Sequence, residues 1–184
     1  MTSDGEKNVA LHNTAPKIVV RPRTTSDVTQ SASALESVHA SDGYPVEGVE
    51  HPIEWLEPAG LLGAWVAVTG EQVVGHVAVT RSAGEEAVSL WAERSGATWN
   101  SIGVLARLFV VSTARGNSLG ECLILAAEEY ARSAGLRLVL DVMAKDSAAI
   151  RLYERLGWSE IGQITHSFGN GGRMDALAYV SPGR

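Results

Sequence analysis

A short glycine-containing turn between an apolar run and an amphipathic run is the segment best suited to bind an anion. Residues 114–120 read Ala-Arg-Gly-Asn-Ser-Leu-Gly, after the apolar run 104–111 and at the start of the amphipathic run 119–134. A strand, a turn and a helix in this order leave N–H groups at the helix N-terminus without intrahelical partners, with the positive end of the helix dipole behind them. The sequence therefore predicts an anion site that fits a pyrophosphate.

Two glycines of this turn, Gly116 and Gly120, are expected to matter because a Cβ at either position would keep the backbone from closing on a phosphate. Glycine-rich turns between strands and helices also occur without any ligand, so the turn alone does not decide the function. The residues downstream add the second part of the pattern.

A compact apolar strand is predicted at 136–142, and a second motif follows it: Ala149-Ile150-Arg151-Leu152-Tyr153-Glu154-Arg155-Leu156-Gly157-Trp158. The order of Arg115-Gly116 and Gly120, then a strand, then this motif resembles the GNAT superfamily of acyl-CoA-dependent N-acetyltransferases. The resemblance is most specific over residues 105–158. It implies acetyl-CoA as co-substrate, no metal, and transfer of an acetyl group to a primary amine by direct attack in a ternary complex.

The resemblance also implies an α/β (α+β) fold, in which helices flank both faces of a central mixed, mostly antiparallel sheet of six to seven strands. We expect a single acetyltransferase domain over residues 17–184, after a flexible tail at 1–16. Periodicity and turn residues predict strands at 17–21, 64–69 and 72–80 and helices over 24–39, 84–94 and 119–134, with one helical turn at 53–56.

The cofactor contacts implied by the resemblance fall on strand, turn and cap positions: Leu108, Phe109, Val110, Arg115, Gly116, Asn117, Ser118, Leu119, Gly120 and Asp146. On the strand, backbone amides would hold the thioester and pantetheine. Three positions depart from the family pattern. Ser118 replaces the middle glycine of the usual turn, Asn117 stands where Lys or Arg is frequent, and Asp146 replaces an Asn. These changes lower the expected affinity for CoA, and a catalytically silent member of the family stays an alternative.

Acetyl transfer needs a proton donor for the thiolate leaving group and an acceptor for the amine proton. The resemblance places the phenol of Tyr153 near the sulfur of CoA, although the same spacing fits a core tyrosine. His76, on a strand expected beside the acetyl-binding strand, is the candidate base, and a buried hydrogen-bonded histidine is the alternative. Other pocket residues considered for this role are Arg107, Asp141 and Glu160, or a water relay.

Acceptor contacts are expected from Tyr44, Trp55 and His166. His166 precedes a glycine-rich turn, and this ending looks like that of small-molecule acetyltransferases such as those for tabtoxin resistance. We therefore expect a small-molecule amine substrate. The alternatives are a protein or peptide N-acetyltransferase and a GNAT-fold binding or regulatory protein.

Composition sets further limits. The 184 residues carry a formal charge of −6, which disfavours nucleic acid and suits an amine. The single cysteine precludes an intramolecular disulfide, and no apolar run is long enough to span a membrane, so we expect a cytoplasmic protein, with a homodimer left open. Helical spacing predicts a buried face that includes Cys122 and an exposed face that includes Glu128.

Overall fold

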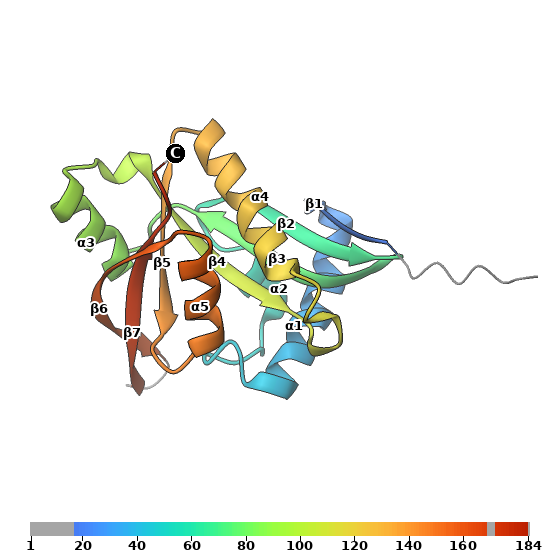
Figure 1. Ribbon diagram of the computed structural model, residues 1–184. Helices are drawn as coiled ribbons and strands as arrows, with labels where there is room; N and C mark the ends of the chain where they lie inside the picture. Colours follow the sequence, from blue (N-terminus) through green and yellow to red (C-terminus); the bar gives the residue numbers. More distant parts are fainter. Residues whose placement is uncertain (1–16, 169–171, 184) are drawn as a thin grey trace, which may run out of the picture.

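The computed structural model describes residues 17–168 and 172–183, which form a seven-stranded sheet in the order β1-β2-β3-β4-β5-β7-β6 (Figure 1). The strands are β1 Ile18–Pro22, β2 Leu61–Thr69, β3 Gln72–Thr80, β4 Ile102–Val110, β5 Arg137–Met143, β6 Ser159–Phe168 and β7 Gly172–Val180. Only β4 and β5 pair in parallel, and the other neighbours are antiparallel. The expected mixed, mostly antiparallel sheet is confirmed.

Helices cover both faces of this sheet (Figure 1). Helices α4 (Leu119–Ser133) and α5 (Ser147–Arg155) share one apolar cluster with Leu138 and Leu140 of β5. Helix α3 (Glu86–Ser95) packs on the other side, where Val139 lies, because successive strand residues point to opposite faces. Helices α1 (Val28–Asp42) and α2 (Pro52–Leu56) form a third cluster with Val66 and Phe109. Within the described ranges, no helix has the length and apolar character needed to cross a membrane.

The elements predicted from the sequence are present, with shifted ends. Helix α1 continues to Asp42 and ends where Gly43 adopts a left-handed φ of 69°. Strand β2 begins at Leu61 rather than at residue 64. Short 3-10 turns at Thr25–Asp27, Trp99–Ser101 and Ser112–Ala114 precede α1, β4 and α4. The expected tail at 1–16 lies outside the described residues.

Helix α4 is rotated relative to the expectation from spacing. Cys122 is exposed and Glu128 is buried, so both predictions were wrong. The buried face instead consists of Leu119, Leu123, Ile124, Ala127, Glu128 and Ala131. A carboxylate is tolerated on this face because Trp158 Nε1 donates a hydrogen bond of 2.7 Å to Glu128 Oε1. This bond ties the end of α4 to the residue that precedes β6.

Candidate active site

A bulge at Arg107 interrupts β4. Ala78 of β3 pairs with Ala106 and His76 pairs with Phe109, so two residues of β4 lie opposite one residue of β3. Arg107 has a φ of 57°, in the left-handed region that is unusual for a residue with a side chain. The extra residue shifts the alternation of side chains. As a result Phe109 packs against α1, while Leu108 contributes to the α4 cluster.

Strands β4 and β5 separate before the bulge and stay apart beyond it (Figure 1). Their pairing covers only Ile102–Val104 of β4, although β4 continues to Val110. Val111 N donates to Val74 O of β3 at 2.9 Å. Because amide directions alternate along a strand, the N–H groups of Leu108 and Val110 point away from β3. They face the edge of β4 that is not paired with β5. These amides can therefore bind a ligand between the diverging strands.

The turn after β4 enters α4 through two residues in the left-handed region. Gly116 has a φ of 80°, and Ser118, the N-cap of α4, has a φ of 55°. The first intrahelical bond runs from Cys122 N to Ser118 O at 3.0 Å, so the preceding amides of the helix have no intrahelical acceptor. Gly120 has another role, because a Cβ there would lie 3.1 Å from Leu152 Cδ2 of α5. Its small size allows α4 and α5 to approach each other.

Polar side chains of this turn bind the protein itself. Arg115 forms an ion pair with Asp42 at the end of α1 and donates from Nε to Val110 O at 3.1 Å. Asn117 Nδ2 donates to Ala114 O at 3.1 Å. These bonds brace the turn and engage its polar side chains within the protein. Asp42 was not anticipated, because nothing in the sequence relates the end of α1 to a turn 73 residues later.

Tyr153 lies on α5 with its side chain buried against Trp158 and Tyr179, at ring-centroid distances of 5.6 and 6.3 Å. Burial raises its pKa above the ordinary value of 10, and the negative charges of Asp146 and Asp141 act in the same direction. The phenol therefore stays protonated at neutral pH. Asp146 caps α5 by accepting from Ala149 N at 3.1 Å.

His76 of β3 is fully buried and both its ring nitrogens have partners. Nε2 lies 3.3 Å from Arg23 Nη1, and Nδ1 lies 3.0 Å from Arg107 O. Since arginine only donates, Nε2 accepts and Nδ1–H donates to the carbonyl. Burial, with the charges of Arg23 and Arg107, lowers the pKa of His76 to about 4. The neutral ring thus fastens the bulge of β4 to β3, and its lone pair is occupied. Arg23 carried no sequence signal for this contact.

Tyr44 and Trp55 meet edge to face at 5.8 Å, next to the bulge. The Arg107 guanidinium lies 5.0 Å from the centroid of the Trp55 ring, and Arg107 Nε donates to Trp55 O. Burial raises the pKa of Tyr44, the charges of Glu47 and Asp141 raise it further, and the charge of Arg107 lowers it. The Tyr153 phenol responds electrostatically to Tyr44 and to Asp141. The carboxyl ends of β4 and β5 thus gather aromatic, cationic and acidic groups.

Two other residues considered for the site, His166 and Glu160, lie on β6. His166 lies on β6 opposite Met174, and its side chain is outside the described part of the structure. Glu160 is exposed on the edge strand β6, where it pairs with Tyr179 of β7.

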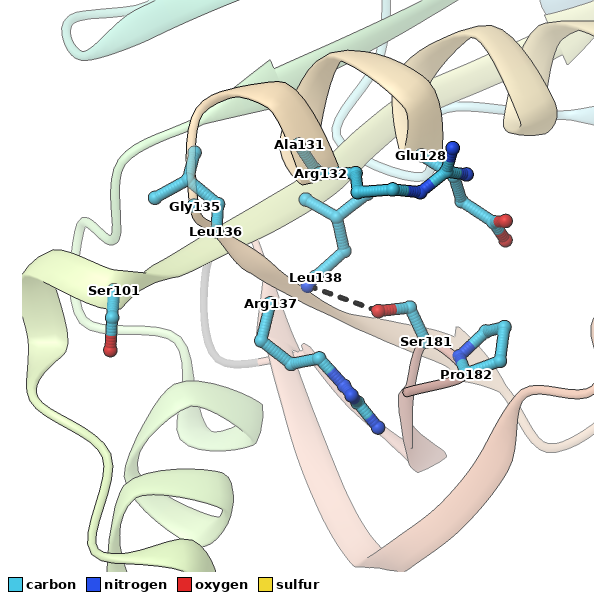
Figure 2. A pocket seen from close by; sticks show the side chains of 10 residues that line it. All are labelled: Ser101, Glu128, Ala131, Arg132, Gly135, Leu136, Arg137, Leu138, Ser181 and Pro182. Atoms are coloured by element: carbon cyan, nitrogen blue, oxygen red, sulfur yellow. Dashed lines mark hydrogen bonds between the residues drawn. The ribbon is translucent and has the colours of Figure 1, made fainter. Parts of the chain in front are cut away.

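A hollow of about 310 Å³ lies at the other end of the sheet, beside the last turns of α4 and the start of β5 (Figure 2). Arg132, Arg137 and Glu128 line it, together with Ser181, whose Oγ accepts from Leu138 N at 3.2 Å. It contains none of the residues expected to bind cofactor or acceptor, so the candidate site rests on strand and helix geometry instead.

Comparison with known proteins identifies the class. A sequence model of the acetyltransferase (GNAT) family matches residues 30–158. No functionally curated protein matches the chain. Among solved structures, Arabidopsis thaliana NAA60 in complex with acetyl-CoA superposes with a TM-score of 0.67 and 23% identity, over 89% of this chain and 97% of that one.

Two further structures have different acceptors in their descriptions. A ribosomal-protein-alanine N-acetyltransferase from Brucella melitensis has a TM-score of 0.67 and 21% identity, over 89% of this chain and 98% of its own. A candidate phosphinothricin N-acetyltransferase has a TM-score of 0.65 and 18% identity, over 90% and 98%. The family match covers most of this chain, which therefore belongs to the acetyltransferase (GNAT) family. It is an acyltransferase of this class.

Proposed function

We propose that this protein transfers the acetyl group of acetyl-CoA to the primary amine of a small molecule. The observation that carries the proposal is the divergence of β4 from β5 together with the bulge at Arg107, which leaves the amides of Leu108 and Val110 facing the separated edge. Residues 17–184 would act as one domain.

The N-terminus of α4 is the proposed site of the pyrophosphate. The amides that follow Ser118 lack intrahelical acceptors and lie at the positive end of a 15-residue helix. Gly116 supports this role through its positive φ, with nothing within 4 Å of where its Cβ would be. The ion pair of Arg115 with Asp42 supports the shape of the turn.

The proposed reaction is a direct displacement. The amine nitrogen attacks the thioester carbonyl, the new C–N bond forms, the C–S bond breaks, and the thiolate accepts a proton. Tyr153 is the proposed donor, because its buried phenol remains protonated. Both ring nitrogens of His76 have hydrogen-bond partners within the protein, so the ring does not suit a base. We assign His76 to positioning the bulge. Asp141 is the proposed acceptor of the amine proton, because it is half-buried on β5, two residues beyond the last pairing of β5 with β4.

A compact acceptor is favoured by the packing of Tyr44 on Trp55 beside Arg107. A peptide N-terminus is the second candidate, because the Brucella melitensis neighbour is described as acting on a ribosomal protein.

The test is a transfer assay with acetyl-CoA and two sets of acceptors, followed by mass spectrometry. One set contains small primary amines and amino acids, and the other contains short peptides with free N-termini. Acetylation confined to the small amines is the expected result. Acetylation of peptides alone would reject the small-molecule proposal, and hydrolysis without transfer to either set would reject both.

A further inference from the structure

The enclosed guanidinium of Arg107 has an environment that suggests the acceptor's chemistry. Burial lowers the pKa of two arginines, Arg23 and Arg107. Arg23 has a carboxylate partner, Glu57 Oε1 at 3.4 Å. Arg107 has no ion pair in the described part of the chain, although the charges of Glu47 and Glu85 oppose the effect of burial on its pKa, and its Nε donates to the backbone oxygen of Trp55. These carboxylates act on the charge of Arg107 without a hydrogen bond to its Nη groups, so the lost hydration of those groups has no direct replacement among the described residues.

The position of this guanidinium is fixed from two sides. Its backbone is held in the bulge by the bond between Arg107 O and His76. Its side chain is held by the Trp55 carbonyl and by the face of the Trp55 ring at 5.0 Å. Neither Nη group donates a hydrogen bond to any described residue. Two parallel N–H donors on a fixed plane match the two oxygens of a carboxylate.

Arg107 also lies next to the proposed reaction centre. It directly precedes Leu108, whose amide faces the separated edge of β4. The Trp55 ring that lies against the guanidinium also packs edge to face on Tyr44 at 5.8 Å, and Asp141 lies on β5 two residues beyond its last pairing with β4. An acceptor with an amine near Asp141 and a carboxylate on Arg107 would meet opposite charges at both ends.

We propose that the acceptor is a compact amine that also carries a carboxylate, as in a free amino acid, and that Arg107 binds this carboxylate. The inference rests on the proposed acetyl transfer to a small amine. The guanidinium selects against polyamines, whose second ammonium would lie near a like charge. It also selects against amides of the same amine, which leave a charged donor pair without an anionic partner.

The experiment compares free amino acids with their carboxamides at equal concentration, using glycine, L-alanine, L-methionine and β-alanine, with putrescine as a dication. Acetylation is followed by mass spectrometry and kcat/KM is determined for each acceptor that reacts. We expect kcat/KM for at least one amino acid to exceed that for its carboxamide by about 30-fold or more. In Arg107→Gln the preference disappears through a raised KM for the amino acid, and Arg107→Lys restores part of it because the charge remains.

Arg94→Gln, the same change at an exposed arginine in the last turn of α3, is the matched control and keeps the preference. Calorimetry with acetyl-CoA and thermal unfolding on each variant separate loss of recognition from loss of structure. Equal rates for acids and amides, a preference that survives in Arg107→Gln, or acetylation of putrescine alone would overturn the proposal. So would a failure to acetylate any amino acid while acetyl-CoA binds. Failure of acetyl-CoA to bind would instead reject the acetyltransferase function itself.

Discussion

Nδ1 of His76 lies 3.0 Å from the carbonyl oxygen of Arg107, so a buried ring on β3 holds the bulge of β4. The bulge determines which amides of β4 face the separated edge and where the guanidinium of Arg107 lies. Positioning of the site therefore depends on a neutral histidine, and this dependence has a consequence for stability at low pH.

The unfolding free energy should fall as the pH decreases from about 6.5 to about 4. The folded pKa of His76 is about 4, below the ordinary 6.5, so in this window the unfolded chain binds a proton that the folded chain does not. The contribution is complete above pH 6.5, and its loss amounts to about 3 kcal/mol at pH 4. Urea unfolding at several pH values measures it.

His76→Gln removes the titrating group and should flatten this part of the pH profile. His51→Gln, at an exposed histidine, is the control and should retain the slope of the native protein. An unchanged slope in His76→Gln would show that other groups cause the acid sensitivity.

Ser118→Gly should stabilise the fold by about 1 kcal/mol, because Ser118 has a φ of 55° that glycine adopts without steric cost. Ser118→Ala keeps the strained backbone and removes the hydroxyl, so any difference in acetyl-CoA affinity between Ser118→Ala and the native chain reports the hydroxyl. Chemical denaturation gives the stability change. Ser112→Gly, at a position without a positive φ, should instead be neutral or destabilising, and a gain there equal to that of Ser118→Gly would reject the explanation.

Tyr153→Phe should lower kcat by about 100-fold while the dissociation constant of acetyl-CoA stays within about threefold, since only the proton donor is lost. Thiol release measured under saturating acceptor gives kcat. The matched control is Tyr130→Phe on α4, whose hydroxyl donates to Leu62 O at 3.2 Å. An equal loss of kcat in both variants would remove Tyr153 from the proposed chemistry.

Glu128→Ala should destabilise the protein by about 2 kcal/mol, because the buried Nε1–H of Trp158 would lose its acceptor. Glu129→Ala is the neighbouring control, with 69% of its side chain exposed, and should change stability by less than about 0.5 kcal/mol. Equal effects in thermal unfolding would contradict the buried bond.

The order of strands and helices could be predicted from the sequence because apolar periodicity, turn glycines and the two motifs all indicate the same fold. The rotation of α4 could not, since a helix with small residues on several sides can bury more than one face, and Glu128 is buried through a partner 30 residues away. Spacing alone contains no information on such a partner.

The candidate site was predicted in part. Gly116 has a left-handed φ, and the serine in place of the middle glycine takes one as well, whereas Gly120 makes room for Leu152 of α5. The bulge at Arg107 has no glycine to mark it. Its sequence signal is a lone arginine inside an apolar strand, a pattern with several explanations until the pairing with β3 is known.

Calorimetric titration of the native chain with acetyl-CoA tests the central claim most directly, with Ser118→Gly and Val110→Pro in parallel. Proline at 110 removes an N–H that faces the separated edge rather than β3. We predict saturable micromolar binding, near −8 kcal/mol, that persists in Ser118→Gly and weakens by about tenfold or more in a folded Val110→Pro variant. Absence of binding in both the native chain and Ser118→Gly would contradict the account, as would full affinity in Val110→Pro.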